Sequence, residues 1–144
     1  MTNDKIKILF LCTGNSCRSQ MAEGLTRNQF GDYFEAYSAG IAPQKLNPLA
    51  VQVMAEMGID ISSHRTKSLH ELLHIPFDYI ITVCDHAHEH CPVFPGNTTL
   101  IHQNFEDPPT LARHAKTEEA ALEIYRRVRN DIYDFVNRLP DILI

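Results

Sequence analysis

The sequence predicts an α/β fold in which helices cover both faces of a four-stranded parallel sheet. Short apolar runs that are typical of buried strands alternate with longer stretches that show helical periodicity. Such alternation is typical of parallel sheets, because each crossover between parallel strands supplies a helix that packs on the sheet. The length of 144 residues suits one domain, and we expect residues 1–144 to form it.

The first strand and helix are expected over residues 6–12 and 19–30. The run IKILFLC is continuously apolar and is followed by a loop that contains Gly and Asn, as expected for a buried strand. Ser19 is expected to cap the helix, because its hydroxyl can accept a hydrogen bond from a backbone N–H of the first turn, and Gly31 to end it.

A second strand is expected over residues 34–39, followed by the clearest amphipathic helix of the chain. Asn47 and Pro48 are typical of a helix start, and apolar residues recur at helical spacing up to Gly58. The second half of the chain continues the alternation. We expect a weaker helical segment, two strands and a long final helix, over residues 69–73, 78–84, 98–102 and 117–139.

Composition excludes several classes of function. A formal net charge of −5 without a basic stripe argues against a nucleic-acid-binding protein. The N-terminal apolar run is too short for a signal-peptide core, and no later run approaches the length of a membrane span. We therefore expect a cytoplasmic protein, where the four cysteines stay reduced and serve redox catalysis or metal binding rather than a disulfide framework.

The loop between the first strand and helix has the pattern Cys-x5-Arg-Ser, with Cys12 as a candidate nucleophile and Arg18 as a candidate oxyanion ligand. Backbone N–H groups at a helix N-terminus form an anion site, and a guanidinium can hold two oxygens of a tetrahedral oxyanion. The positive electrostatic potential of these N–H groups and of Arg18 is expected to lower the pKa of the Cys12 thiol. The residues expected to bind the anion are Thr13, Gly14, Asn15, Ser16, Cys17, Arg18 and Ser19.

Asp107, which precedes two prolines in a loop, is a candidate general acid that could protonate a departing oxygen.

The second cysteine pair, Cys84 and Cys91, flanks the segment DHAHEH. If this segment is helical, seven steps of about 1.5 Å separate the two Cα atoms by about 10 Å, whereas a disulfide needs less than about 7 Å. A bond between them would require the segment to unwind, which suggests a redox switch. A metal site that uses the cysteines with His86, His88 and His90 is the alternative.

These motifs together resemble the thioredoxin-coupled arsenate reductases of the low-molecular-weight tyrosine phosphatase fold. The resemblance covers nearly the whole chain. It rests on CTGNSCRSQMAEG at 12–24, YSAG at 37–40, GIDIS at 58–62, Cys84-x6-Cys91-Pro92 and the Asp-Pro at 107–108.

The resemblance implies a relay of three thiols. Cys12 attacks arsenate while Asp107 acts as the acid. Cys84 then attacks Cys12, which releases arsenite and forms a Cys12–Cys84 disulfide. Cys91 finally attacks Cys84, which gives a Cys84–Cys91 disulfide. Thioredoxin is the implied electron donor. Cys17 is expected to be a small filling residue, so that Cys17→Ala retains turnover.

The resemblance also concerns a cation site. Potassium-binding members of the family use an Asn, a Glu, a Ser and an Asp. Asn15, Glu23 and Ser38 match, but Lys67 occupies the fourth position. We expect the Lys67 ammonium to replace the ion and to order the loop through Asn15 and Glu23, so that no potassium, other metal or tightly bound cofactor is required.

Two alternatives remain open. A tyrosine phosphatase would use Cys12, Arg18 and Asp107 without the second cysteine pair, and weak phosphatase activity is compatible with the reductase as well. A metal-binding or arsenite-binding module would instead use the pair with its histidines. In each case we expect a monomer without membrane contact.

Overall fold

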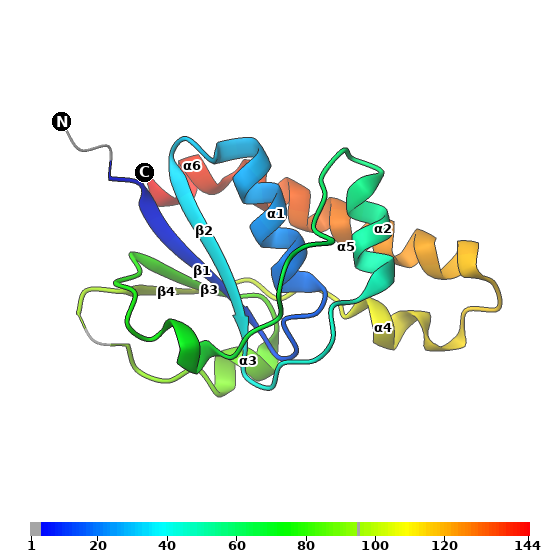
Figure 1. The fold of residues 1–144 in the computed structure, drawn as a ribbon, viewed down its shortest axis with the longest axis horizontal. Coiled ribbons are helices and arrows are strands. Elements are labelled where there is room, and N and C mark those ends of the chain that lie inside the picture. The colour runs from blue at the N-terminus through cyan, green and yellow to red at the C-terminus, as the bar shows by residue number, and fades with distance from the viewer. Residues whose placement is uncertain (1–3, 95) are drawn as a thin grey trace.

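The computed structural model describes residues 4–94 and 96–144 and confirms the four-stranded parallel α/β fold (Figure 1). The strand order in the sheet is β2-β1-β3-β4, and all three pairings are parallel. Residues 8–12 of β1 are all buried, because layers of the chain cover both faces of the sheet at this central strand. The strands are β1 (Ile6–Cys12), β2 (Phe34–Gly40), β3 (Tyr79–Thr82) and β4 (Thr99–His102).

Helices connect the strands in the expected alternation. The α-helices are α1 (Arg18–Phe30), α2 (Pro48–Ala55), α3 (Asp85–Glu89), α4 (Pro108–Leu111), α5 (Glu118–Asn137) and α6 (Leu139–Leu143). The described residues also contain two 3-10 helices, η1 (Leu69–Leu72) and η2 (Ala112–His114). In the part of the chain that the structure describes, none of the helices combines the length and the apolar character that a membrane crossing needs.

Two helix starts match the prediction, and one does not. Asn47 accepts hydrogen bonds from the N–H groups of Leu49 and Ala50, and Thr117 caps α5. The prediction that Ser19 caps α1 is wrong, because α1 begins one residue earlier and Ser19 lies inside it, fully buried. Its hydroxyl is used by the loop instead, as described below.

The ends of several elements also differ from the prediction. Strand β3 ends at Thr82 rather than at Cys84, because Cys84 is the N-cap of the short helix α3. The residues after Asp107 form α4 rather than an open loop, with Pro108 at its first position, where a missing N–H costs nothing. Pro140 does not stop the last helix: α5 ends at Asn137, and Pro140 lies in the first turn of α6.

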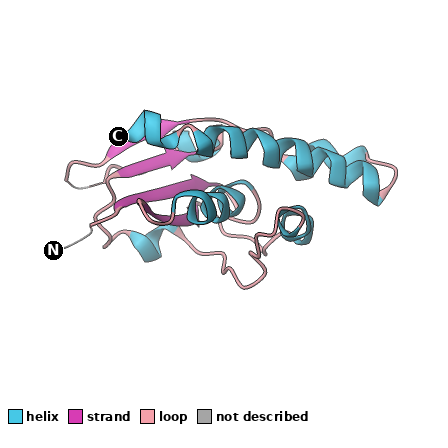
Figure 2. Ribbon diagram, turned by 90° about the horizontal axis from the view of Figure 1, so that it is seen from above, coloured by secondary structure: helices cyan, strands magenta, loops and turns pink. Residues whose placement is uncertain are grey.

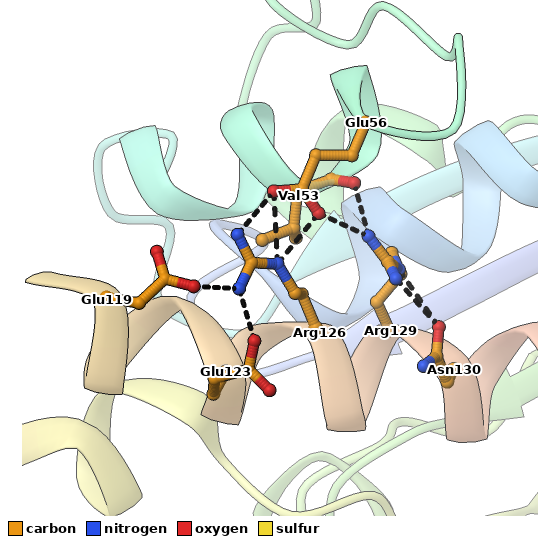
Figure 3. A network of polar contacts seen from close by, with 7 residues as sticks. All are labelled: Val53, Glu56, Glu119, Glu123, Arg126, Arg129 and Asn130. Atoms are coloured by element: carbon orange, nitrogen blue, oxygen red, sulfur yellow. Dashed lines mark hydrogen bonds and ion pairs between the residues drawn. The ribbon is translucent and has the colours of Figure 1, made fainter.

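Helix α5 holds α2 in place at both of its ends (Figures 1 and 2). At the start of α2, Asn47 Nδ2 donates to the hydroxyl of Tyr125 at 2.9 Å. At its end, Glu56 accepts hydrogen bonds from Arg126 and from the largely buried Arg129 (Figure 3). Arg126 also pairs with Glu119 and Glu123 of its own helix, while Arg129 also donates to the Val53 carbonyl and to Asn130. The segment that leads into α2 is thereby fixed.

Candidate active site

The loop that follows β1 is bound along the chain segment that follows β2. The N–H groups of Ile41, Ala42, Gln44 and Asn47 donate in turn to the carbonyls of Cys12, Thr13, Gly14 and Ser16, at 2.8 to 3.1 Å. Gly40 makes this approach possible, since a Cβ there would lie 2.7 Å from the carbonyl oxygen of Thr13. The loop is therefore shaped by backbone contacts of its carbonyl groups with residues 41–47.

A cavity of about 260 Å³ opens in this loop. Its lining residues are Cys12, Thr13, Gly14, Ser16, Cys17, Arg18, Gln44, Asp107 and Pro109. The cavity is thus lined by the candidate nucleophile Cys12, the candidate oxyanion ligand Arg18 and the candidate acid Asp107, although Asp107 is far from the loop in the sequence. Gln44 and Pro109 were not proposed as site residues from the sequence. Gln44 reaches the cavity only because residues 41–47 pair with the loop.

Two groups point at the sulfur of Cys12. The N–H of Asn15 donates to it at 3.1 Å, and the hydroxyl of Ser19 lies 2.8 Å away. Asn15 Nδ2 donates to the same hydroxyl oxygen at 2.8 Å, so the hydroxyl hydrogen is free to point at the sulfur. This use of the Ser19 hydroxyl explains why it does not cap α1.

The predicted lowering of the Cys12 pKa is wrong in direction. Burial raises the pKa of the Cys12 thiol above its ordinary value, although the hydrogen bond from Ser19 and the charge of Arg18 act in the opposite sense. Burial likewise raises the pKa of Cys17, which is consistent with a residue that fills space. The anion loop provides hydrogen bonds that stabilise an anionic Cys12 sulfur, but the cost of burying its charge is larger.

Asn15 is the centre of a buried hydrogen-bond network behind the loop. It has a positive φ of 51°, a left-handed conformation that asparagine tolerates better than most residues. Its Oδ1 accepts from Gln20 Nε2 at 3.1 Å and from the backbone N–H of Lys67 at 3.0 Å. Gln20 Oε1 in turn lies 3.0 Å from Nδ1 of His64, whose pKa is lowered by burial. Neither Gln20 nor His64 was assigned a role from the sequence, because both act through another side chain.

The residues that the resemblance assigns to a potassium site are engaged with other groups of the chain. Glu23 accepts from Ser38 at 2.5 Å and pairs with Arg27 at 3.0 Å, so its two oxygens already have partners. The Lys67 ammonium donates to the carbonyl of Arg65 rather than to Asn15. The expected link from Lys67 to Asn15 is therefore made by the Lys67 backbone, while burial lowers the pKa of its ammonium.

Arg18 and Asp107 line the cavity together and contact each other. Arg18 Nη1 donates to the Phe105 carbonyl at 2.9 Å, and Nη2 lies 3.4 Å from Asp107 Oδ1. The hydroxyl of Thr110 donates to Asp107 Oδ2 at 2.6 Å. These contacts orient the carboxyl toward the cavity at the edge of the loop.

Cys84 lies beside the loop, and Cys91 lies beyond the far end of α3. The sulfur of Cys84 is 3.4 Å from the hydroxyl of Thr13 and accepts from the N–H of Ala87 at 3.4 Å, as the cap of α3. Cys91 is partly exposed, and burial of its thiol raises its pKa. All four cysteines are free thiols.

The histidines of the alternative metal site do not converge. The rings of His86 and His90 lie with centroids 4.3 Å apart and are tilted by 43°, whereas His88 stacks on His102. Within residues 4–94 and 96–144, no group of three or more His, Cys, Asp or Glu side chains is arranged to hold a metal ion.

Comparison with known proteins gives the family. The family model described as low molecular weight phosphotyrosine protein phosphatase matches residues 7–134. The chain is 45% identical over 130 residues to an arsenate reductase of Halalkalibacterium halodurans, which covers 90% of this chain and 91% of that protein. It is 46% identical over 138 residues to arsenate reductase 2 of Staphylococcus saprophyticus, covering 96% and 98% of the two chains.

Solved structures agree with this assignment. A structure described as an arsenate reductase in the phosphate binding state superposes with a TM-score of 0.76 at 26% identity, over 96% of this chain and 99% of that one. A low molecular weight protein tyrosine phosphatase from T. tengcongensis superposes with a TM-score of 0.74 at 29% identity, over 96% and 100%. The chain therefore belongs to the low molecular weight phosphotyrosine protein phosphatase family, within which it groups with the arsenate reductases.

Proposed function

We propose that this arsenate reductase works through a relay of three cysteines, Cys12, Cys84 and Cys91, and that thioredoxin returns it to the reduced state. The observation that carries the proposal is the position of Cys84, whose sulfur contacts the hydroxyl of Thr13, the residue next to Cys12. A second thiol at the edge of the anion loop has no use in phosphate ester hydrolysis, but it is what a reductase needs.

In the first step the Cys12 sulfur attacks arsenic, and one arsenate oxygen leaves as water with a proton from Asp107. Arg18 and the loop N–H groups hold the remaining oxygens. The Cys12 thiol, whose pKa is raised by burial, gives its proton to an oxygen of the bound arsenate as the attack begins, and hydrogen bonds from Ser19 and Asn15 support the anionic sulfur that forms.

In the second step the thiolate of Cys84 attacks the sulfur of Cys12. The sulfur–arsenic bond breaks, its electron pair stays on arsenic, and As(V) leaves as As(III) in arsenite, while a Cys12–Cys84 disulfide forms. In the third step Cys91 attacks Cys84, which frees Cys12 and forms Cys84–Cys91. Two electrons and two protons from the dithiol of thioredoxin reduce this last disulfide.

The coupled assay with arsenate, thioredoxin, thioredoxin reductase and NADPH tests the proposal. Wild type should oxidise NADPH continuously. Cys91→Ser should stop after about one turnover, because the Cys12–Cys84 disulfide cannot be exchanged for a Cys84–Cys91 disulfide that thioredoxin reduces. Continuous turnover by Cys91→Ser would rule out the relay.

Hydrolysis of p-nitrophenyl phosphate by the same variants separates the phosphatase alternative. The Cys12 loop, Arg18 and Asp107 suffice for ester hydrolysis, so weak phosphatase activity should survive Cys84→Ser and Cys91→Ser and be lost in Cys12→Ser. A main role as a phosphatase would be supported only if ester hydrolysis were efficient and arsenate reduction absent.

A further inference from the structure

His102, at the end of β4, contacts helix α3 at two positions. Its Nε2 lies 2.8 Å from Oδ1 of Asp85, the first residue of α3, and its ring stacks on His88 with centroids 4.3 Å apart and an interplanar angle of 25°. Residues three apart lie on the same face of a helix, so Asp85 and His88 present one face of α3 to this ring. On its other side, Nδ1 of His102 lies 2.8 Å from the hydroxyl of Thr82 on β3.

A carboxylate only accepts, so Nε2 of His102 carries the hydrogen that is donated to Asp85. Nδ1 of the same ring shares a hydrogen bond with the hydroxyl of Thr82, which also lies 3.4 Å from the Ile101 carbonyl oxygen. His102 thus joins the end of the sheet to the start of α3 through directed hydrogen bonds, and we call the contacts of His102 with Thr82, Asp85 and His88 the His102 clasp.

Helix α3 needs such support because it is very short. Its backbone bonds include those from His88 to Cys84 and from His90 to His86, both at 3.1 Å, and one turn of helix is unstable by itself in water. The sulfur of Cys84 caps the first turn by accepting from Ala87, whose side chain is fully buried. Once this sulfur is bonded in a disulfide it is no longer available as the same cap, which leaves the buried Ala87 and the clasp to hold α3.

The same helix keeps Cys84 and Cys91 apart. The six steps from Cys84 to His90 span about 9 Å of helix, so Cys91 reaches Cys84 only if α3 opens. Contacts that stabilise the closed helix therefore oppose the disulfide and favour the two thiols.

We propose that the His102 clasp sets the redox equilibrium of the Cys84–Cys91 pair, with His102 and Asp85 as positioning residues of the relay. This inference rests on the proposed relay, since it concerns the disulfide that ends it. The clasp holds α3 closed while Cys84 faces Thr13 and the loop. It also makes the final disulfide easier to reduce, because α3 and its clasp form again when the two thiols are restored.

The test is a redox titration of the full chain that carries Cys12→Ser and Cys17→Ser, so that only Cys84 and Cys91 react. Oxidised dithiothreitol takes two electrons and two protons from the two thiols, which leaves the Cys84–Cys91 disulfide and reduced dithiothreitol. After alkylation of free thiols, mass spectrometry gives the oxidised fraction at each ratio of the two forms of dithiothreitol. The same background is prepared with His102→Ala, with Asp85→Asn, with both, and with His114→Ala as an exposed histidine outside the clasp.

Loss of the clasp should raise the equilibrium constant for oxidation about fivefold, the scale of a partly exposed charged hydrogen bond. His102→Ala and Asp85→Asn should each show this rise, the double variant should show little more than either, and His114→Ala should match the background.

Constants that are equal in all five proteins overturn the proposal, and so do additive effects of the two substitutions. If the background protein forms no Cys84–Cys91 disulfide even in excess oxidant, the relay itself fails and the clasp proposal falls with it. A small structural loss in His102→Ala cannot imitate the effect, because Asp85→Asn keeps the shape of the side chain.

Discussion

The hydroxyl of Thr13 lies 3.4 Å from the sulfur of Cys84. Thr13 is the first residue after Cys12, so this contact joins the candidate nucleophile's loop to the first resolving thiol across 71 positions of the chain. A hydroxyl that donates to a sulfur stabilises the thiolate form, which is the attacking species in disulfide exchange.

Replacing Thr13 by Val should slow the attack of Cys84 on the arsenic adduct of Cys12. Loss of a hydrogen bond to a charged sulfur costs about 1.5 kcal/mol, which corresponds to roughly tenfold in rate. Thr13→Ser keeps the hydroxyl and should restore most of the rate. Rapid quenching of a single turnover, followed by mass spectrometry of the Cys12–Cys84 disulfide, measures this step. A Thr13→Val enzyme that forms the disulfide as fast as wild type would show that the contact has no role in the attack.

Gly40→Ala should damage both stability and substrate binding. The new Cβ would lie 2.7 Å from the Thr13 carbonyl and 3.0 Å from the Asn15 nitrogen, both backbone atoms of the anion loop. We expect a loss of at least about 2 kcal/mol in unfolding free energy and a higher KM for arsenate.

Gly58→Ala is the matched control for this prediction. Gly58 has a φ of 75°, but a Cβ there meets no atom within 4 Å. Gly58→Ala should lower the unfolding free energy by about 1 kcal/mol through backbone strain alone and leave the KM for arsenate unchanged. Urea unfolding and steady-state kinetics compare the two, and an equal KM in both variants would contradict the account of Gly40.

Glu56 should contribute stability that acid removes. Hydrogen bonds from Arg126, and then from Arg129, lower the pKa of the Glu56 carboxyl from its ordinary value of 4.5. A lowered pKa in the folded state means that the stabilisation is complete above pH 4.5 and is lost as the pH falls through the folded-state pKa.

Glu56→Gln should therefore lower the unfolding free energy by roughly 1 kcal/mol at neutral pH and flatten the decline in stability as the pH falls below 4.5. Glu119→Gln, which removes a more exposed partner of the same Arg126, should cost less than about 0.5 kcal/mol. Urea unfolding at several pH values measures the unfolding free energy of each variant. If it declined with pH in parallel for wild type and Glu56→Gln, Glu56 would not be the source of the acid-sensitive stability.

Activity and melting temperature should be the same in potassium and in sodium at equal ionic strength. The oxygens of Asn15 and Glu23 that the resemblance assigns to the ion already have partners here, and the Lys67 ammonium, which donates to the Arg65 carbonyl, adds a positive charge that interacts with Glu23. Lys67→Asp should restore the donor set and make the melting temperature rise with potassium. A marked potassium effect on wild type would contradict this.

Local patterns explain which features could be predicted from the sequence. The apolar run before Cys12 and the polar, glycine-containing loop after it are contiguous, and so are Asn47 with Pro48 at a helix start. Parallel strands carry their carboxyl ends to one edge of the sheet, which is why Asp107 could be expected near Cys12 in spite of its distance along the chain.

Features that depend on long-range contacts could not be predicted. Ser19 has the sequence signature of a helix cap, but the sulfur of Cys12 competes for its hydroxyl. The pKa of Cys12 depends on how thoroughly the loop is buried, and the pattern of residues does not show this. His102 had no visible partner because the pairing of β3 with β4 is what places it over α3.

The most direct test of the relay is a single turnover of Cys91→Ser with one equivalent of arsenate and no reductant. The relay predicts one arsenite per enzyme, loss of two free thiols, and a Cys12–Cys84 peptide pair in the mass spectrum after digestion. Cys84→Ser should release no arsenite under the same conditions. Arsenite release from Cys84→Ser, or a Cys91→Ser enzyme that yields arsenite without the Cys12–Cys84 disulfide, would contradict the relay.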